Sequence, residues 1–123
     1  MVKKTITYTD YNGDIRTEDF YFNISKLEIN RAEIDAEHSL SSTLKHAAET
    51  KNARELMECC ELLIRMGYGI KSPDGKKFTK SDELTEEFIS SPAYEQLFFE
   101  LMSDPDSFAM FIKAVLPPIP QNA

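Results

Sequence analysis

Few side chains in this chain of 123 residues have the types and spacing needed for catalysis or metal binding. His38 and His46 lie eight positions apart, and a helix start near residue 39 breaks the helical register between them. A metal site also needs more ligands than such a pair supplies. The hydroxyl residues at 41–43 lack the glycine-flanked surroundings of an activated serine. The sequence therefore predicts a protein that is not an enzyme and holds no metal or cofactor.

An acidic run at the start of a predicted helix has a simple electrostatic explanation. Its members are Asp82, Glu83, Glu86 and Glu87. Negative side chains stabilise the N-terminal end of a helix, where the helix dipole is positive. Paired carboxylates that exchange protons with a substrate are the alternative, and that interpretation requires a pocket around them.

Cys59 and Cys60 are adjacent within a predicted helix. Neighbouring side chains on a helix diverge by about 100°, so a disulfide between the two sulfur atoms is not expected. We expect free thiols, as in proteins of a reducing compartment.

The N-terminal residues alternate between polar and apolar types, which is the period of a β-strand. Residues 2–9 alternate, and so do residues 15–24, where Phe20, Phe22 and Ile24 share one face. Asn12-Gly13 between the two runs favours a hairpin turn, because both residues tolerate positive φ. A lone hairpin is marginally stable in water, so its apolar face is expected to pack against helices.

Helical patterns follow the hairpin. Two helices begin at capping boxes, Ser25/Glu28 and Asn52/Glu55. The predicted helices cover residues 26–37, about 40–48, 53–66 and a stretch that Ser81 caps. Residues 70–80 form a predicted turn region, with a small hairpin that brings Ile70 and Phe78 together as one option.

Two further helices open with a capping residue followed by proline, at Ser91-Pro92 and Asp104-Pro105. Both carry apolar residues at i, i+3, i+4, i+7 and i+8: Tyr94, Leu97, Phe98, Leu101 and Met102 in one, and Phe108, Phe111, Ile112, Val115 and Leu116 in the other. The fold class predicted is α+β and mostly α, with an N-terminal antiparallel β-hairpin packed on a bundle of about five to six short helices. Residues 1–116 are expected to form a single domain. Residues 117–123 are expected to form an extended tail, because prolines interrupt helices.

Composition and charge narrow the class of function. The formal net charge is −7, whereas proteins that bind nucleic acids or anionic lipids need Lys and Arg to neutralise phosphates. No apolar stretch is long enough to span a bilayer, and the N-terminus lacks the apolar core of a signal peptide. We therefore expect a cytoplasmic protein with no nucleic-acid or membrane partner.

Four large apolar side chains lie outside the core stripes of their helices and are the candidate partner-binding residues: Leu62, Met66, Phe99 and Met110. For the helix at 53–66, the predicted core stripe is Leu56, Met57, Cys60, Leu63 and Ile64. Exposed apolar patches mark interaction sites, and methionine adapts to varied partners. The alternatives are a central helix packed on two sides, and single exposed hydrophobes without a function.

Three stretches together resemble one protein family. They are residues 4–26 (KTITYTDYNG, then RTEDFYFNISK), residues 67–88 (with GYGIKS and DGKKF) and residues 93–101 (with AYE, LF and EL). Their order and spacing resemble the tail assembly chaperones of long-tailed, siphovirus-type bacteriophages, in the version common among phages and prophages of Gram-positive hosts. The resemblance covers about residues 4–116, and residues 29–50 depart from it.

The resemblance implies a non-enzymatic chaperone that coats the hydrophobic, helical tape measure protein and keeps it soluble until the tail tube polymerises around it. A longer, frameshifted form that recruits the major tail tube protein is frequent in the family, and a coat of many copies implies a homo-oligomer. Such a factor works in the cytoplasm of the bacterial host and is not expected in the mature virion. The alternative is a small acidic inhibitor or antitoxin-like module that neutralises a basic protein by charge.

Overall fold

The computed structural model describes residues 1–35 and 53–117 of the chain. In these ranges the strands are β1 (Val2–Thr9), β2 (Ile15–Phe22), β3 (Tyr68–Lys71) and β4 (Phe78–Thr79). The helices are α1 (Lys26–Asp35), α3 (Ala53–Gly67), α4 (Asp82–Ile89), α5 (Pro92–Ser103) and α6 (Pro105–Val115). The predicted α+β class with an N-terminal antiparallel hairpin is confirmed. The helix predicted near 40–48 and the tail beyond Pro117 fall outside the described residues, and the boundary of the domain at 116 stays a prediction.

The hairpin forms where the alternation and the Asn-Gly pair predicted it. β1 and β2 pair in an unbroken antiparallel register that ends at Thr9 opposite Ile15. In the turn, the Asp10 carboxylate accepts hydrogen bonds from the amides of Asn12 and Asp14, each at 2.9 Å. Gly13 adopts a φ of +90°, which a residue with a side chain adopts only with strain.

The sheet is larger than the sequence indicated. α3 ends at Gly67, and the next residue starts β3, which pairs with β2 and extends the hairpin to a four-stranded sheet in the order β1-β2-β3-β4. β3 and β4 form the small hairpin considered above, but Ile70 pairs with Thr79 rather than with Phe78. Gly69 is required in β3, because a Cβ atom there would lie 2.8 Å from the Phe78 ring.

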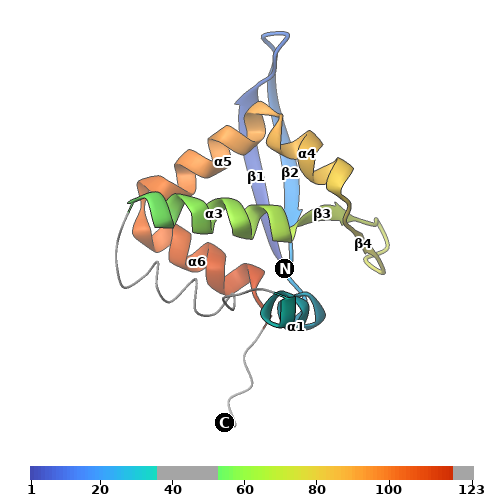
Figure 1. Cartoon of the computed structure of the whole chain (residues 1–123). Coiled ribbons are helices and arrows are strands. Elements are labelled where there is room, and N and C mark those ends of the chain that lie inside the picture. The colour runs from blue at the N-terminus through green and yellow to red at the C-terminus, as the bar shows by residue number, and fades with distance from the viewer. Residues whose placement is uncertain (36–52, 118–123) are drawn as a thin grey trace.

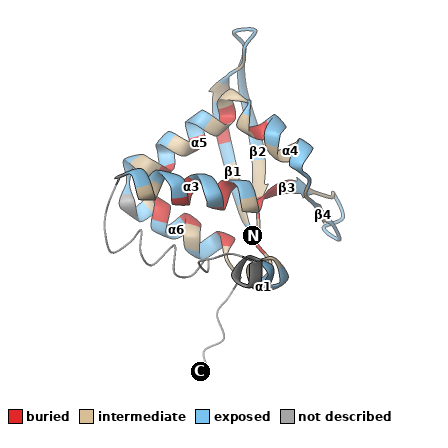
Figure 2. Ribbon diagram, in the orientation of Figure 1, coloured by how far each residue is buried: buried red, intermediate tan, exposed pale blue. Residues whose placement is uncertain are grey.

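Helices α3, α5 and α6 cover one face of the hairpin. α5 and α6 contact β1, α3 contacts β2, and α4 contacts β3, whereas the tip of the hairpin extends beyond the helices (Figure 1). The buried positions of α3, α5 and α6 lie on their inward sides, and the exposed positions follow their outer sides (Figure 2).

Aromatic rings from four elements join the core. Phe22 of β2 is fully buried, and its ring centroid lies 5.8 Å from that of Tyr68, 5.7 Å from that of Phe88 and 5.5 Å from that of Phe111. Tyr68 and Phe88 stack at 4.4 Å. Such pairs add about 0.5–1.5 kcal/mol each beyond the burial of their area. The rings therefore fasten β2, β3, α4 and α6 to one another.

Hydrogen bonds confirm the predicted caps of α1, α4 and α6, whereas the predicted capping box of α3 includes Asn52, which lies outside the described residues. The Ser25 amide donates to Glu28 and the Glu28 amide donates to Ser25 Oγ, at 3.0 and 3.2 Å, which completes the capping box of α1. Ser81 and Asp104 each accept a backbone amide of the helix that follows. Ser91 precedes α5 as predicted but does not cap it, because its hydroxyl donates to a carbonyl of α4 at 2.6 Å.

The apolar stripes predicted for α5 and α6 are buried or half-buried throughout. The stripe of α3 is wrong at one position. Met57 is exposed, and Cys59 takes its place in the core beside Cys60, Leu63 and Ile64. Met57 and Cys59 lie at opposite edges of the apolar face of α3, so the helical period alone does not predict which of the two is buried. The structure turns the smaller side chain inward.

Candidate functional site

The four candidate partner-binding residues lie on three helices and differ in exposure. Met110 on α6 is 71% exposed, Phe99 on α5 is 61% exposed, and Leu62 on α3 is 37% exposed. Met66, at the end of α3, is half-buried and packs against the core. The structure thus leaves three of the four available to a partner and gives Met66 a share in the core.

Phe99 is the outer end of a chain of aromatic rings that begins in the core. Its ring centroid lies 6.3 Å from that of Phe98, which lies 6.1 Å from that of Tyr94, which in turn lies 5.9 Å from that of buried Phe88. Phe98 and Tyr94 are half-buried. The exposed ring therefore continues the apolar surface of the core outward along α5.

Met110 lies on the outer side of α6, opposite the buried stripe of Phe108, Phe111 and Val115. Between α5 and α6 the chain turns at Asp104, whose carboxylate accepts the Asp106 amide and the Ser107 hydroxyl, both at 3.1 Å. Phe99 and Met110 lie five and six residues from this corner. The hydrogen bonds at Asp104 therefore fix how the two helices present their exposed side chains.

Other exposed hydrophobes were not selected from the sequence. Tyr11 and Ile15 are at the tip of the hairpin, Leu27 is on α1, Met57 on α3 and Ile70 on β3. A signal for Ile15 was present, because the alternation places it with Thr17 and Asp19 on the outer face of β2. Met57 was missed because it borders the core stripe.

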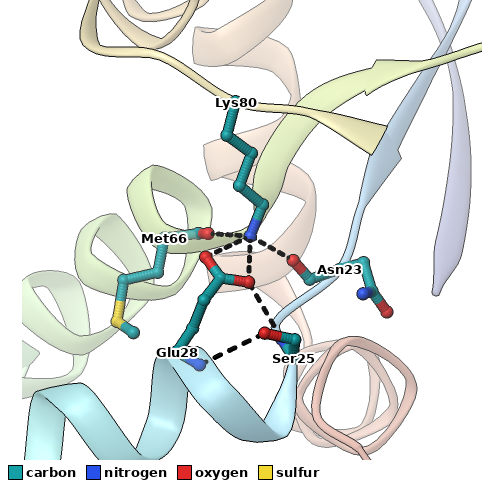
Figure 3. A network of polar contacts seen from close by, with 5 residues as sticks. All are labelled: Asn23, Ser25, Glu28, Met66 and Lys80. Carbon is teal, nitrogen blue, oxygen red and sulfur yellow. Dashed lines mark hydrogen bonds and ion pairs between the residues drawn. The ribbon is translucent and has the colours of Figure 1, made fainter. Parts of the chain in front are cut away.

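A polar network around Lys80 connects α1, α3 and the segment that precedes α4 (Figure 3). The Lys80 ammonium donates to both carboxylate oxygens of Glu28, at 2.8 and 2.7 Å, and to the backbone carbonyls of Met66 and Asn23, at 2.6 and 2.5 Å. Burial raises the pKa of Glu28, but hydrogen bonds from Lys80 and the Ser25 amide outweigh it and leave that pKa below its usual value. The network ties the start of α1 and the end of α3 to the start of α4.

The acidic run forms an open surface rather than an enclosed active site. Asp82, Glu83, Glu86 and Glu87 line, with Ser90, an open hollow of about 720 Å³. All five residues come from α4 and its C-terminal cap, and Arg65 of α3 lies 3.3 Å from Glu86. The helix-dipole interpretation accounts for Asp82 and Glu83, which stand in the first turn of α4.

Both cysteines are buried and free. Burial raises the pKa of Cys59 to about 11 and that of Cys60 to about 12. Because the thiolate is the reactive form, neither thiol is activated near neutral pH. Within residues 1–35 and 53–117, no group of three or more His, Cys, Asp or Glu residues is placed to hold a metal ion. In the same ranges, no helix is both long and apolar enough to cross a membrane.

Comparison with curated proteins and with solved structures returns no match. A family model described as phage tail assembly chaperone matches residues 1–122, which is nearly the whole chain. The match agrees with the resemblance found in the hairpin, the β3–β4 region and α5, and it favours a chaperone over the inhibitor alternative. The chain belongs to the phage tail assembly chaperone family.

Proposed function

We propose that this chain is a non-enzymatic chaperone that binds the tape measure protein and keeps it soluble in the host cytoplasm until the tail tube forms. The observation that carries the proposal is the exposed apolar surface of α5 and α6 in a member of this family. Phe99 and Met110 stand exposed there although the core of the domain is complete without them.

The physical basis is recognition of an amphipathic helix by an apolar surface. Burying a large apolar side chain that was exposed contributes about 1.5–3 kcal/mol before the costs of association. Two such anchors support weak binding at each site, and many copies along one tape measure protein gain strength from multivalency. Weak individual sites also allow the growing tube to displace the copies one after another.

The proposal extends to two further contacts. A coat of copies implies self-association, for which exposed Leu62 and Met57 on α3 are available. A longer, frameshifted form is proposed to recruit the major tail tube protein through a second domain.

Co-expression tests the proposal. The tape measure protein is produced from the same phage or prophage with and without this chain, and its soluble fraction is measured after centrifugation. The proposal predicts that the tape measure protein is soluble and co-purifies with this chain only when both are present. A tape measure protein that stays insoluble, or that is equally soluble alone, would contradict it.

A further inference from the structure

The negative charge of the chain is concentrated on α4, α5 and α6, and two of these helices, α5 and α6, carry the exposed Phe99 and Met110. Residues 82–115 contain eight acidic side chains and one basic side chain, Lys113. Their net charge of −7 equals the formal net charge of the whole chain, so the remaining residues are balanced. α4, α5 and α6 are therefore the acidic part of the molecule.

The eight acidic residues of these helices lie on the surface. They are Asp82, Glu83, Glu86, Glu87, Glu95, Glu100, Asp104 and Asp106, and each is exposed. Within the described ranges, Glu86 pairs with Arg65 and Glu100 with Lys4, at 3.3 and 3.2 Å, and the other six have no ion-pair partner. An acidic surface of this kind attracts a basic partner and repels an acidic one.

On each of α5 and α6, an acidic side chain lies one helical turn before the exposed apolar side chain. Glu95 precedes Phe99 by four residues on α5, and Asp106 precedes Met110 by four residues on α6. Side chains four apart lie on the same face of a helix, so each exposed hydrophobe has a carboxylate beside it.

We infer that the outer surface of α5 and α6 is a docking site for an amphipathic helix whose apolar face is flanked by Lys and Arg. Phe99 and Met110 bind the apolar face, and the carboxylates pair with the basic flanks. The inference rests on the proposed function, and it specifies which segments of the tape measure protein the chaperone covers: basic amphipathic ones. It also gives the acidic surface a part in selecting those segments.

Binding of two synthetic helical peptides to the full-length chain tests the inference. Both peptides are about 20 residues long, enough for helix formation, and have the same Leu/Phe face, but one has Lys flanks and the other has Glu flanks. We expect the Lys peptide to bind about tenfold or more tightly than the Glu peptide, with an affinity that falls as salt is added. Equal affinity for the two peptides, or no binding of either, would overturn the inference.

Variants separate the contributions of the apolar and acidic side chains. Phe99→Ser is expected to lower the affinity for the Lys peptide by about tenfold, as for the loss of an aromatic anchor. The double variant Glu95→Gln/Asp106→Asn is expected to lower the affinity for the Lys peptide and to make that affinity less dependent on salt. Ile15→Ser and Asp14→Asn, at the hairpin tip, are the matched apolar and charge controls and should leave binding unchanged. Thermal unfolding verifies that each variant is folded.

Three other outcomes separate failure of the inference from failure of the proposed function. The average molecular mass in solution could rise with protein concentration in the wild type but not in the Glu95→Gln/Asp106→Asn variant. In that case a second copy of the chain occupies the surface through basic residues such as Lys76 and Lys77, and the inference is wrong. If co-expression still solubilises the tape measure protein while the two peptides bind equally, the inference is wrong and the proposed function stands. If co-expression fails as well, the proposed function falls with it.

Discussion

Lys80 and Glu28 are 52 positions apart and form a two-point ion pair, with Lys80 Nζ 2.7 and 2.8 Å from the two Glu28 carboxylate oxygens. The same ammonium bonds the Met66 carbonyl, near the C-terminal end of α3, where the helix dipole is negative. One side chain thus joins the start of α1 and the end of α3 to the segment that precedes α4.

Lys80→Met is expected to destabilise the protein by about 2 kcal/mol, because it leaves a partly buried carboxylate and two carbonyls without their donor. Urea unfolding measures the change. Lys76→Met and Lys77→Met, in the exposed β3–β4 turn, are the controls and should change stability by less than about 0.5 kcal/mol. A Lys80→Met variant as stable as these controls would show that the network adds nothing.

Stability should fall in acid partly through Glu28. Its pKa in the folded protein is held below the usual value of 4.5, so its stabilising contribution is present above that pH. The contribution is lost as the pH falls through the lower, folded pKa. Melting temperatures from pH 7 to pH 3 should therefore converge for wild type and Glu28→Gln at the acid end. A gap between the two curves that is constant across this range would contradict the linkage.

The cysteine thiols should resist labelling in the folded state. Cys59 and Cys60 are buried, and burial raises the pKa values of both thiols, so the thiolate is scarce and inaccessible. An aromatic disulfide reagent at pH 8 should react at a rate set by unfolding and should react with both thiols at once in guanidinium chloride. Rapid labelling of either thiol in the native protein would show that α3 is less well packed than described.

Local patterns predicted the elements well. The alternation of residues 2–9 and 15–24 and the Asn12-Gly13 turn gave the hairpin, and the two cap-proline pairs gave α5 and α6 with their buried stripes. In each case, the determinants lie within a few residues of one another, so they can be seen in the sequence.

Features that depend on distant residues were missed. β3 is a short segment containing Gly69, and it becomes a strand because β2 offers it an edge. Lys80 ends the predicted turn region of residues 70–80, and nothing nearby in sequence indicates Glu28 as its partner. Phe99 and Met110 were identified from the sequence because a hydrophobe opposite a core stripe is itself a local pattern. That pattern does not indicate which partner the two residues bind.

In the proposed function, Phe99 and Met110 bind the tape measure protein. Changing both to Ser should preserve the fold, because neither side chain belongs to the buried core. The matched control changes Tyr11 and Ile15, two exposed hydrophobes at the hairpin tip, to Ser.

The most direct measurement is the soluble yield of the tape measure protein co-expressed with wild type, with Phe99→Ser/Met110→Ser and with the hairpin control. We expect the wild type and the hairpin control to keep the tape measure protein soluble. The Phe99→Ser/Met110→Ser variant, although folded and equally abundant, is expected to leave most of the tape measure protein in the pellet. A Phe99→Ser/Met110→Ser variant that solubilises as much tape measure protein as the wild type would contradict the claim.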